Sequence, residues 1–91
     1  MEVLKVSAHS KPQSVAGAIA GTIRENGTAE VQAIGAGAIN QAVKAVTIAR
    51  GYLAPHGYDV VMIPAFVEVM LDTEERTALR LLVQPRKRRA G

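Results

Sequence analysis

The chain has 91 residues, of which 48% are hydrophobic and 21% charged, a composition typical of a single globular domain. It contains no cysteine, which excludes disulfides, thiolate metal sites and cysteine nucleophiles. The net charge of +3 is unevenly spread, because residues 86–89 (RKRR) carry +4 and the rest of the chain has seven Lys and Arg against eight acids. We therefore expect one domain over residues 1–85 and a basic, flexible tail over 86–91.

The first third of the chain predicts strand, helix and strand in turn. Residues 2–8 contain a short run rich in Val and Leu that is typical of a strand. Pro12 suits the first turn of a helix, and Asn26-Gly27 is a C-terminal stop signal. Between them the apolar residues recur at helical spacing: Val15, Ala16, Ile19, Ala20 and Ile23. Residues 29–34 predict a second short strand.

The rest of the chain predicts a helix and then two strands. Apolar residues from Ile39 to Leu53 follow helical spacing and end near Pro55. Residues 58–71 predict a long strand whose central run is apolar on both faces, which indicates a buried strand, with Pro64 marking an edge or a bulge. A turn at 72–76 and a returning strand at 77–83 complete an α+β, two-layer fold. Its order is β-α-β-α-β-β, with two helices on one face of a four-stranded mixed sheet.

The loop before the second helix is rich in glycine and reads AIGAGAINQA over residues 33–42. It lacks the third glycine of a dinucleotide-binding fingerprint, because Asn40 stands at that position. A glycine-rich turn onto a helix N-terminus still presents unpaired N–H groups to an anion, which makes Gly35 and Gly37 candidate phosphate contacts. The alternative is a tight strand-to-helix connection without a ligand.

Basic residues provide the other candidate phosphate contacts. Lys11 lies in the loop after the first strand, at the same edge of the predicted parallel pair as the glycine loop. The tail contributes Arg86, Lys87, Arg88 and Arg89, which would attract phosphates. The alternative interpretation is that Lys11 and the tail are only solvated and contact no phosphate.

Signals for catalysis, metals and membranes are weak. His9 and His56 are the only histidines and have no carboxylate cluster near them in the sequence, so we expect no catalytic residues, no metal site, no cofactor and no small-molecule substrate. The longest apolar stretch, residues 60–67, is far shorter than a membrane span needs. The charged Glu2 and Lys5 argue against a secretory signal, so we expect a cytoplasmic protein that is not an enzyme.

A second, partly apolar stripe runs along the second helix and predicts self-association. It contains Gln41, Ala45, Ile48 and Tyr52. A two-layer domain of this size with apolar residues left over is a candidate homodimer or higher oligomer. The alternative is that Ile48 and Tyr52 are scattered surface hydrophobes.

Three segments resemble the stage V sporulation protein S (SpoVS) family: MEVLKVSAHSKPQSVAGAIAGTIRENG, AEVQAIGAGAINQAVKAVTIARGYLAP and EERTALRLLVQPR. The resemblance covers about residues 1–86 and implies a small bacterial protein with an Alba-like fold, a role in sporulation and nucleic-acid binding. Alba proteins carry a Lys-Pro after the first strand, matched here by Lys11-Pro12, and the resemblance implies that Lys11 contacts nucleic acid. They also carry Ala-Ile-x-x-Ala-Val on the second helix, matched by residues 38–43.

The chain departs from the Alba pattern in two places. Gly37 stands where these proteins often have an arginine, and the expected hairpin tip holds Asp72, Glu74 and Glu75, which phosphates would repel. We therefore expect weakly specific, phosphate-directed binding of DNA or RNA through Lys11, the glycine loop and the tail. The alternative is a protein-interaction or scaffold module without direct nucleic-acid binding.

Overall fold

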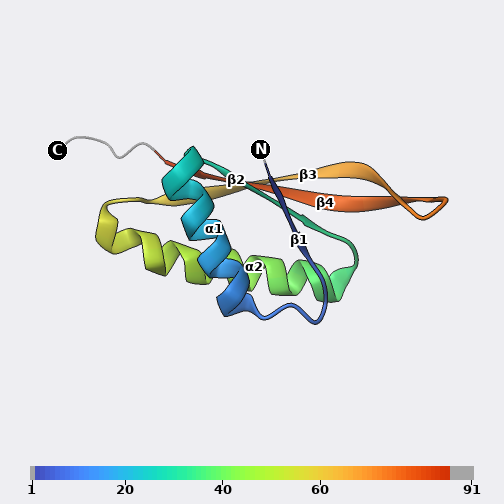
Figure 1. The fold of residues 1–91 in the computed structure, drawn as a ribbon, viewed down its shortest axis with the longest axis horizontal. Helices are drawn as coiled ribbons and strands as arrows, with labels where there is room; N and C mark the ends of the chain where they lie inside the picture. Colours follow the sequence, from blue (N-terminus) through green and yellow to red (C-terminus); the bar gives the residue numbers. More distant parts are fainter. Residues whose placement is uncertain (1, 87–91) are drawn as a thin grey trace.

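A computed structural model of the chain describes residues 2–86 and has two layers (Figure 1). In chain order the elements are β1 (Val3–Val6), α1 (Pro12–Asn26), β2 (Ala29–Ala33), α2 (Ala36–Leu53), the short 3-10 helix η1 (Ala54–His56), β3 (Val60–Leu71) and β4 (Glu74–Pro85). The predicted order β-α-β-α-β-β and the α+β, four-stranded mixed sheet are confirmed.

The strands lie in the order β1-β2-β4-β3. β1 and β2 are parallel, so the two loops that follow them meet at one edge of the sheet. β4 is antiparallel to β2, with Ala29 opposite Val83 and Ala33 opposite Leu79, and it is also antiparallel to β3. The last strand of the chain therefore lies between β2 and β3, and β3 forms an edge of the sheet.

The core lies between the helices and one face of the sheet. The alternating pattern of β2, with Ala29, Val31 and Ala33 buried, directs every second side chain to the helices. From α1 and α2 the core receives mostly alanine and isoleucine, and the alanines permit close approach of the two helices: Ala16, Ile19, Ala20, Ile23, Ala38, Ala42, Ala45 and Ala49. The other face of the sheet carries polar residues such as Lys5, Glu30 and Arg80.

The prediction that the long strand is buried is wrong. Of its twelve residues only Val60 is buried, and Phe66 and Met70 are 80% and 64% exposed. The cause is tertiary, because β4 takes the inner position and the two helices cover only the part of the sheet near β2. Pro64 does lie on an edge strand, where a residue without an N–H donor is tolerated.

The hairpin turn is shorter than predicted. Only Asp72 and Thr73 separate β3 from β4, so Glu74, Glu75 and Arg76 belong to β4 and not to the turn. Asp72 adopts a left-handed conformation with φ of 58°, which Asp tolerates better than most residues. The two acids at the start of β4 therefore line the end of a paired hairpin.

Candidate nucleic-acid interface

Lys11 occupies the N-cap position of α1, with extended backbone angles of −83° and 118°, and its side chain is exposed. Pro12 follows at the first helical position, as predicted, and the Lys11 carbonyl accepts hydrogen bonds from the N–H groups of Ser14 and Val15 at 3.1 Å each. The start of α1 therefore fixes the backbone of Lys11 and leaves its ammonium group in solvent.

The Lys11 loop and the glycine loop lie against each other. Gln41 Nε2 donates a 2.9 Å hydrogen bond to the carbonyl of Ser10, which joins the first turns of α2 to the residue before Lys11. At Gly37 a Cβ atom would lie 3.0 Å from the Cβ of Ala8, closer than side chains normally pack. The predicted candidates Lys11, Gly35 and Gly37 are therefore brought together at one edge of the molecule.

Each glycine of the loop has a structural reason to be there. Gly35 is the N-cap of α2 with φ of 88°, a conformation that favours glycine, and its carbonyl accepts the N–H of Ile39 at 3.0 Å. At Gly37 the close approach of Ala8 leaves little room for a side chain. A tight connection therefore explains both residues, while the exposed first turn of α2 still presents its N–H groups at the edge where Lys11 lies.

The predicted tail contacts lie at the other end of the sheet. Arg86 follows directly on β4, which runs antiparallel to β2, so Arg86 is near the start of β2 while the glycine loop follows its end. In Figure 1 the end of β4 is at the left and the start of α2 is near the right of the helix layer. The structure does not bring Arg86 together with Lys11; Lys87, Arg88 and Arg89 lie outside the described residues.

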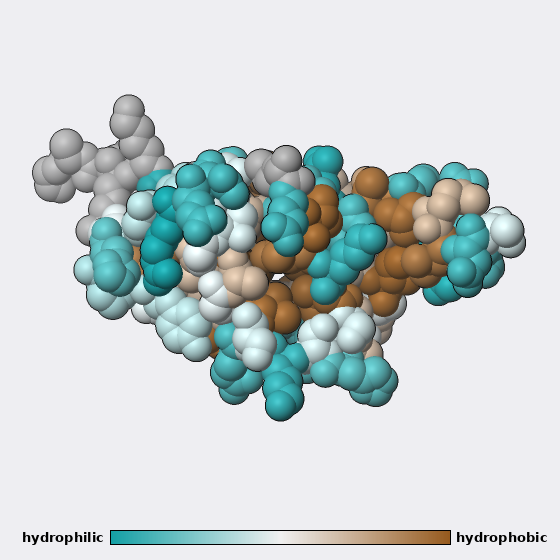
Figure 2. Space-filling view, viewed as in Figure 1, coloured by the Kyte–Doolittle hydropathy of each residue, from teal (hydrophilic) through white to brown (hydrophobic). Residues whose placement is uncertain are grey.

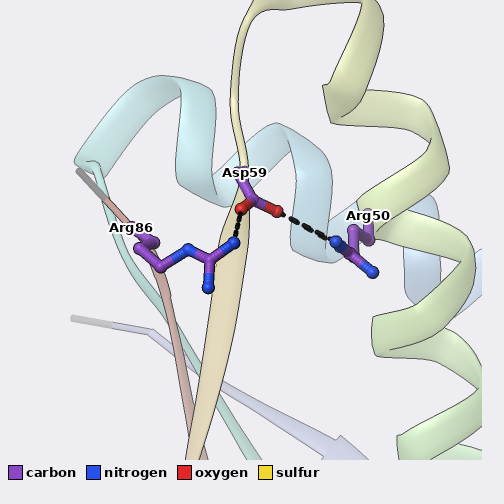
Figure 3. Close-up of polar contacts among 3 residues, drawn as sticks. All are labelled: Arg50, Asp59 and Arg86. Carbon is purple, nitrogen blue, oxygen red and sulfur yellow. Dashed lines mark hydrogen bonds and ion pairs between the residues drawn. The ribbon is translucent and has the colours of Figure 1, made fainter. Parts of the chain in front are cut away.

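Arg86 and Arg50 share the carboxylate of Asp59 (Figure 3). Arg50 Nε donates to one oxygen at 3.2 Å, the Arg86 guanidinium donates to the other, and the Arg86 N–H donates to the Asp59 carbonyl at 2.6 Å. The Asp59 side chain is 16% exposed, whereas the two arginines are more than 60% exposed. This Asp59 clamp ties the end of β4 to α2, so Arg86, predicted as the first tail residue, is bonded to the domain.

The hydrogen bond from Arg86 is the main reason that the pKa of Asp59 lies below its ordinary value of 3.8. Arg50 lowers this pKa further, against the opposing effect of burial. Asp59 is therefore ionised at neutral pH, and it partly neutralises the two arginines. No sequence signal points to this clamp, because its members are separated by 9 and 27 residues.

Charge is segregated between the two layers. Within residues 2–86, the helix layer with its loops (residues 7–28 and 34–57) has four Lys and Arg against one acid, Glu25, a net charge of +3. The strand layer (residues 2–6, 29–33 and 58–86) has four Lys and Arg against seven acids, a net charge of −3. The domain is neutral as a whole, but its helix segments are basic and its strand segments acidic. Of the four helix-layer cations, Arg50 is paired with Asp59 of the strand layer.

The four residues predicted for a dimer interface differ in how accessible they are. Ala45 is fully buried within the protomer, and Gln41 is half-buried and bonded to Ser10. Ile48 packs partly against the core, and Tyr52 is 43% exposed. A partner on this stripe would therefore meet mainly Tyr52 and the exposed part of Ile48.

A family model described as Stage V sporulation protein S (SpoVS) matches residues 2–86. The chain belongs to the SpoVS family. The match spans every helix and strand of the fold and stops at the residue held by the Asp59 clamp. As a SpoVS member the chain is a small sporulation-related protein, and SpoVS is not a known enzyme family.

Two further observations concern the described part of this SpoVS chain. No helix within residues 2–86 has the length and apolar character that crossing a membrane requires. Over the same residues, no three His, Asp or Glu side chains come together as a possible metal-binding group.

Proposed function

We propose that this SpoVS protein is a cytoplasmic, non-enzymatic regulator that binds nucleic acid through the phosphates of its backbone, with weak sequence specificity. The observation that carries the proposal is the segregation of charge, which gives the helix layer a net charge of +3 within a neutral domain. A basic face attracts a polyanion even when the domain as a whole carries no net charge.

The edge formed by Lys11 and the glycine loop supports contact with phosphates. Lys11 offers a fixed backbone and a free ammonium group, and the start of α2 beside it offers N–H groups and the positive end of the helix dipole. The acidic residues of the β3–β4 hairpin lie outside this layer. Binding through Lys11 and backbone N–H groups reads phosphates and not base edges, which accounts for the proposed weak specificity.

The test is fluorescence anisotropy with a labelled duplex and a labelled single strand at about 50 and 200 mM salt. Lys11→Glu is expected to weaken binding and to reduce the salt slope by about 1, because one phosphate contact is lost. Lys5→Glu makes the same change of charge on the opposite sheet face and is the matched control. A chain ending at Pro85 measures the contribution of Arg86 and the tail separately.

The outcomes distinguish binding by the Lys11 edge from binding by net charge alone and from binding by the tail. Equal losses in Lys11→Glu and Lys5→Glu would show that net charge alone matters and that the Lys11 edge is no binding face. Binding that disappears only when residues 86–91 are removed would assign it to the tail. An absence of binding in every form would overturn the proposal.

A second candidate function, a protein-interaction module, is favoured by the hairpin and not by the helix layer. Phe66 and Met70 are exposed by 80% and 64%, which is unusual for large apolar side chains on a small domain. A pulldown with the full chain and with Phe66→Ser, each with and without nuclease, tests it. A specific partner that survives nuclease and is lost with Phe66→Ser would favour this function.

A further inference from the structure

The outer face of the sheet, which the helices do not cover, holds a hollow of about 330 Å³. We call it the outer hollow. Its walls come from three separate segments, namely the end of β1 with the loop after it, the end of β2, and the last residues of β3. Figure 2 shows apolar surface on the hairpin, at the right of the molecule, and continuing toward the middle. The residues that line the hollow from the outer face are Lys5, Ser7, Gln32, Ile34, Val69 and Leu71.

On β1 and β2 the alternation of side chains directs two polar lining residues outward. Val31 and Ala33 are buried against the helices, so Gln32 between them points to the outer face. On β1, Val6 is buried and Lys5 before it points outward. Lys5 and Gln32 are partners in the register of the two parallel strands, so they lie next to each other on this face.

On β3 and β4 the outward side chains near the hollow are apolar. Met62 packs against the core, so Val67, Val69 and Leu71, each an odd number of residues further along β3, point outward. Ala78 of β4 is the partner of Val67 and is only 2% exposed, although the helices lie on the other face. Neighbouring side chains therefore close over the sheet at this place and make its surface concave.

The size of the outer hollow suits a small amphipathic molecule. At about 30 Å³ for each water-sized group, a volume of about 330 Å³ holds about eleven such groups. Pockets for small molecules are mainly apolar and contain a few polar groups that orient the ligand. Here the apolar Ile34, Val69 and Leu71 line the same hollow as the polar Lys5 and Gln32.

The polar groups of the outer hollow have no partner within the described chain. Among residues 2–86, the Lys5 ammonium group forms no ion pair and the Gln32 side chain forms no hydrogen bond. Lys5 is exposed, and Gln32 is half-buried. Both groups donate hydrogen bonds, and such bonds are shorter and stronger when the acceptor is ionised. The two side chains therefore favour an anionic acceptor.

Two arginines of β4 add positive charge to the same face. Arg76 is the partner of Val69, and Arg80 is the partner of Gln32. Side chains of directly opposite residues in antiparallel strands point to the same face, so both arginines flank the outer hollow. With Lys5, three cations therefore surround it.

Two acids share this face but do not line the outer hollow. Glu30 is the partner of Val3, two residues before Lys5, and Glu74 is the partner of Leu71 at the end of the hairpin. Three cations against two acids give the outward side chains of the four strands a net charge of +1, although the strand layer as a whole carries −3. The local charge therefore attracts an anion.

We propose that the outer hollow binds a small amphipathic carboxylate with an apolar body of about nine carbon atoms. The apolar body displaces water from Ile34, Val69 and Leu71, and the carboxylate accepts hydrogen bonds from Lys5 and Gln32. No sequence motif indicates this site, because its walls come from three strands. The proposal does not depend on nucleic-acid binding, which is proposed for the helix layer.

Isothermal titration calorimetry of the full chain with decanoate, below its micelle concentration, tests the proposal. Decanoate has about twelve non-hydrogen atoms, and we expect one molecule to bind per chain with a Kd below about 1 mM. Hexanoate keeps the carboxylate on a shorter chain, and decyltrimethylammonium keeps the chain with the opposite charge. Each is expected to bind at least about tenfold more weakly than decanoate.

Two variants locate the bound decanoate. Lys5→Met keeps a side chain of similar length without its charge and is expected to raise the Kd by about tenfold. Val69→Phe fills the outer hollow and should abolish binding. The matched controls are Lys44→Met on the helix layer and Ile63→Phe on β3 outside the hollow, and both should keep the Kd of the parent.

Circular dichroism checks that each variant folds. Lys5 is exposed, so Lys5→Met should fold as the parent does. If Val69→Phe does not fold, the comparison of the three ligands and the Lys5→Met variant decide between the outcomes.

Any of three results would overturn the proposal. A chain that binds no decanoate up to about 1 mM would show that the outer hollow is not a carboxylate site. Equal affinity for decyltrimethylammonium would show that apolar surface alone attracts these molecules. A Kd unchanged by both Lys5→Met and Val69→Phe would place decanoate on another surface, such as the exposed Phe66 and Met70.

Discussion

Two glycines of α2, Gly37 and Gly51, have different structural roles that the residue type alone does not reveal. Gly51 is exposed near the end of the helix, and nothing lies within 4 Å of where its Cβ would be. Gly37 is also exposed and helical, but a Cβ there would meet Ala8 at 3.0 Å. Gly51 only weakens the helix, whereas Gly37 permits the contact between the glycine loop and the Lys11 loop.

Gly51→Ala is expected to stabilise the protein by roughly 0.5–1 kcal/mol, because alanine favours the helix and restricts the unfolded chain. Gly37→Ala gains the same helix propensity, but we expect the crowding against Ala8 to outweigh it and to lower the free energy of unfolding. Urea unfolding of both variants measures the difference. If Gly37→Ala instead raises the free energy of unfolding, the loop that holds Ala8 moves aside without a loss of stability.

At the scale of elements, three segments distant in the sequence are joined by one side chain. Asp59 precedes β3, Arg50 lies in the last turn of α2, and Arg86 follows β4. Arg50 is also favourable for its helix, since a cation near the C-terminus compensates the helix dipole. The Asp59 clamp therefore joins α2, the start of β3 and the end of β4, at the end of the domain that precedes the basic tail.

The Asp59 clamp predicts a specific dependence of stability on pH. The folded-state pKa of Asp59 lies below its ordinary value of 3.8. The ionised carboxylate therefore contributes fully to the free energy of unfolding above pH 3.8, and this contribution is lost as the pH falls through the lowered pKa. Asp59→Asn should therefore unfold at lower urea than the parent at pH 7, and the two should converge at low pH. Urea midpoints from about pH 2 to 7 measure this.

Arginine variants check the assignment of this pH dependence. Arg86→Gln removes the main partner of Asp59 and should reproduce part of the loss at pH 7. Arg80→Gln removes an equal charge on the outer face of the sheet and should have little effect. Parallel profiles for Asp59→Asn and the parent throughout this range would show that the clamp does not contribute.

At the scale of the whole molecule, the helix layer is the proposed nucleic-acid face. It carries a net charge of +3, whereas the strand layer carries −3, so a polyanion should approach the domain from the helix side. Lys44 is exposed on this layer, and Lys11 lies at its edge.

Some features of this protein were determined by the sequence itself. Hydrophobic spacing predicted every main helix and strand, Pro12 and Asn26-Gly27 marked the ends of α1, and the family resemblance predicted the fold. These signals are local, because the period of apolar residues reflects the backbone conformation of the segment that carries them. The candidate residues Lys11, Gly35 and Gly37 were found together for the same reason, since two parallel strands bring their following loops to one edge.

Only the tertiary structure decided the order of strands, and most of the functional geometry follows from that order. Because β4 lies between β2 and β3, the apolar β3 is an exposed edge, and because β4 runs antiparallel to β2, Arg86 lies at the far end from Lys11. The charge of the neutral domain also separates into a basic helix layer and an acidic strand layer only when the chain is folded. Which strand pairs with which depends on contacts between distant residues, and no local periodicity records them.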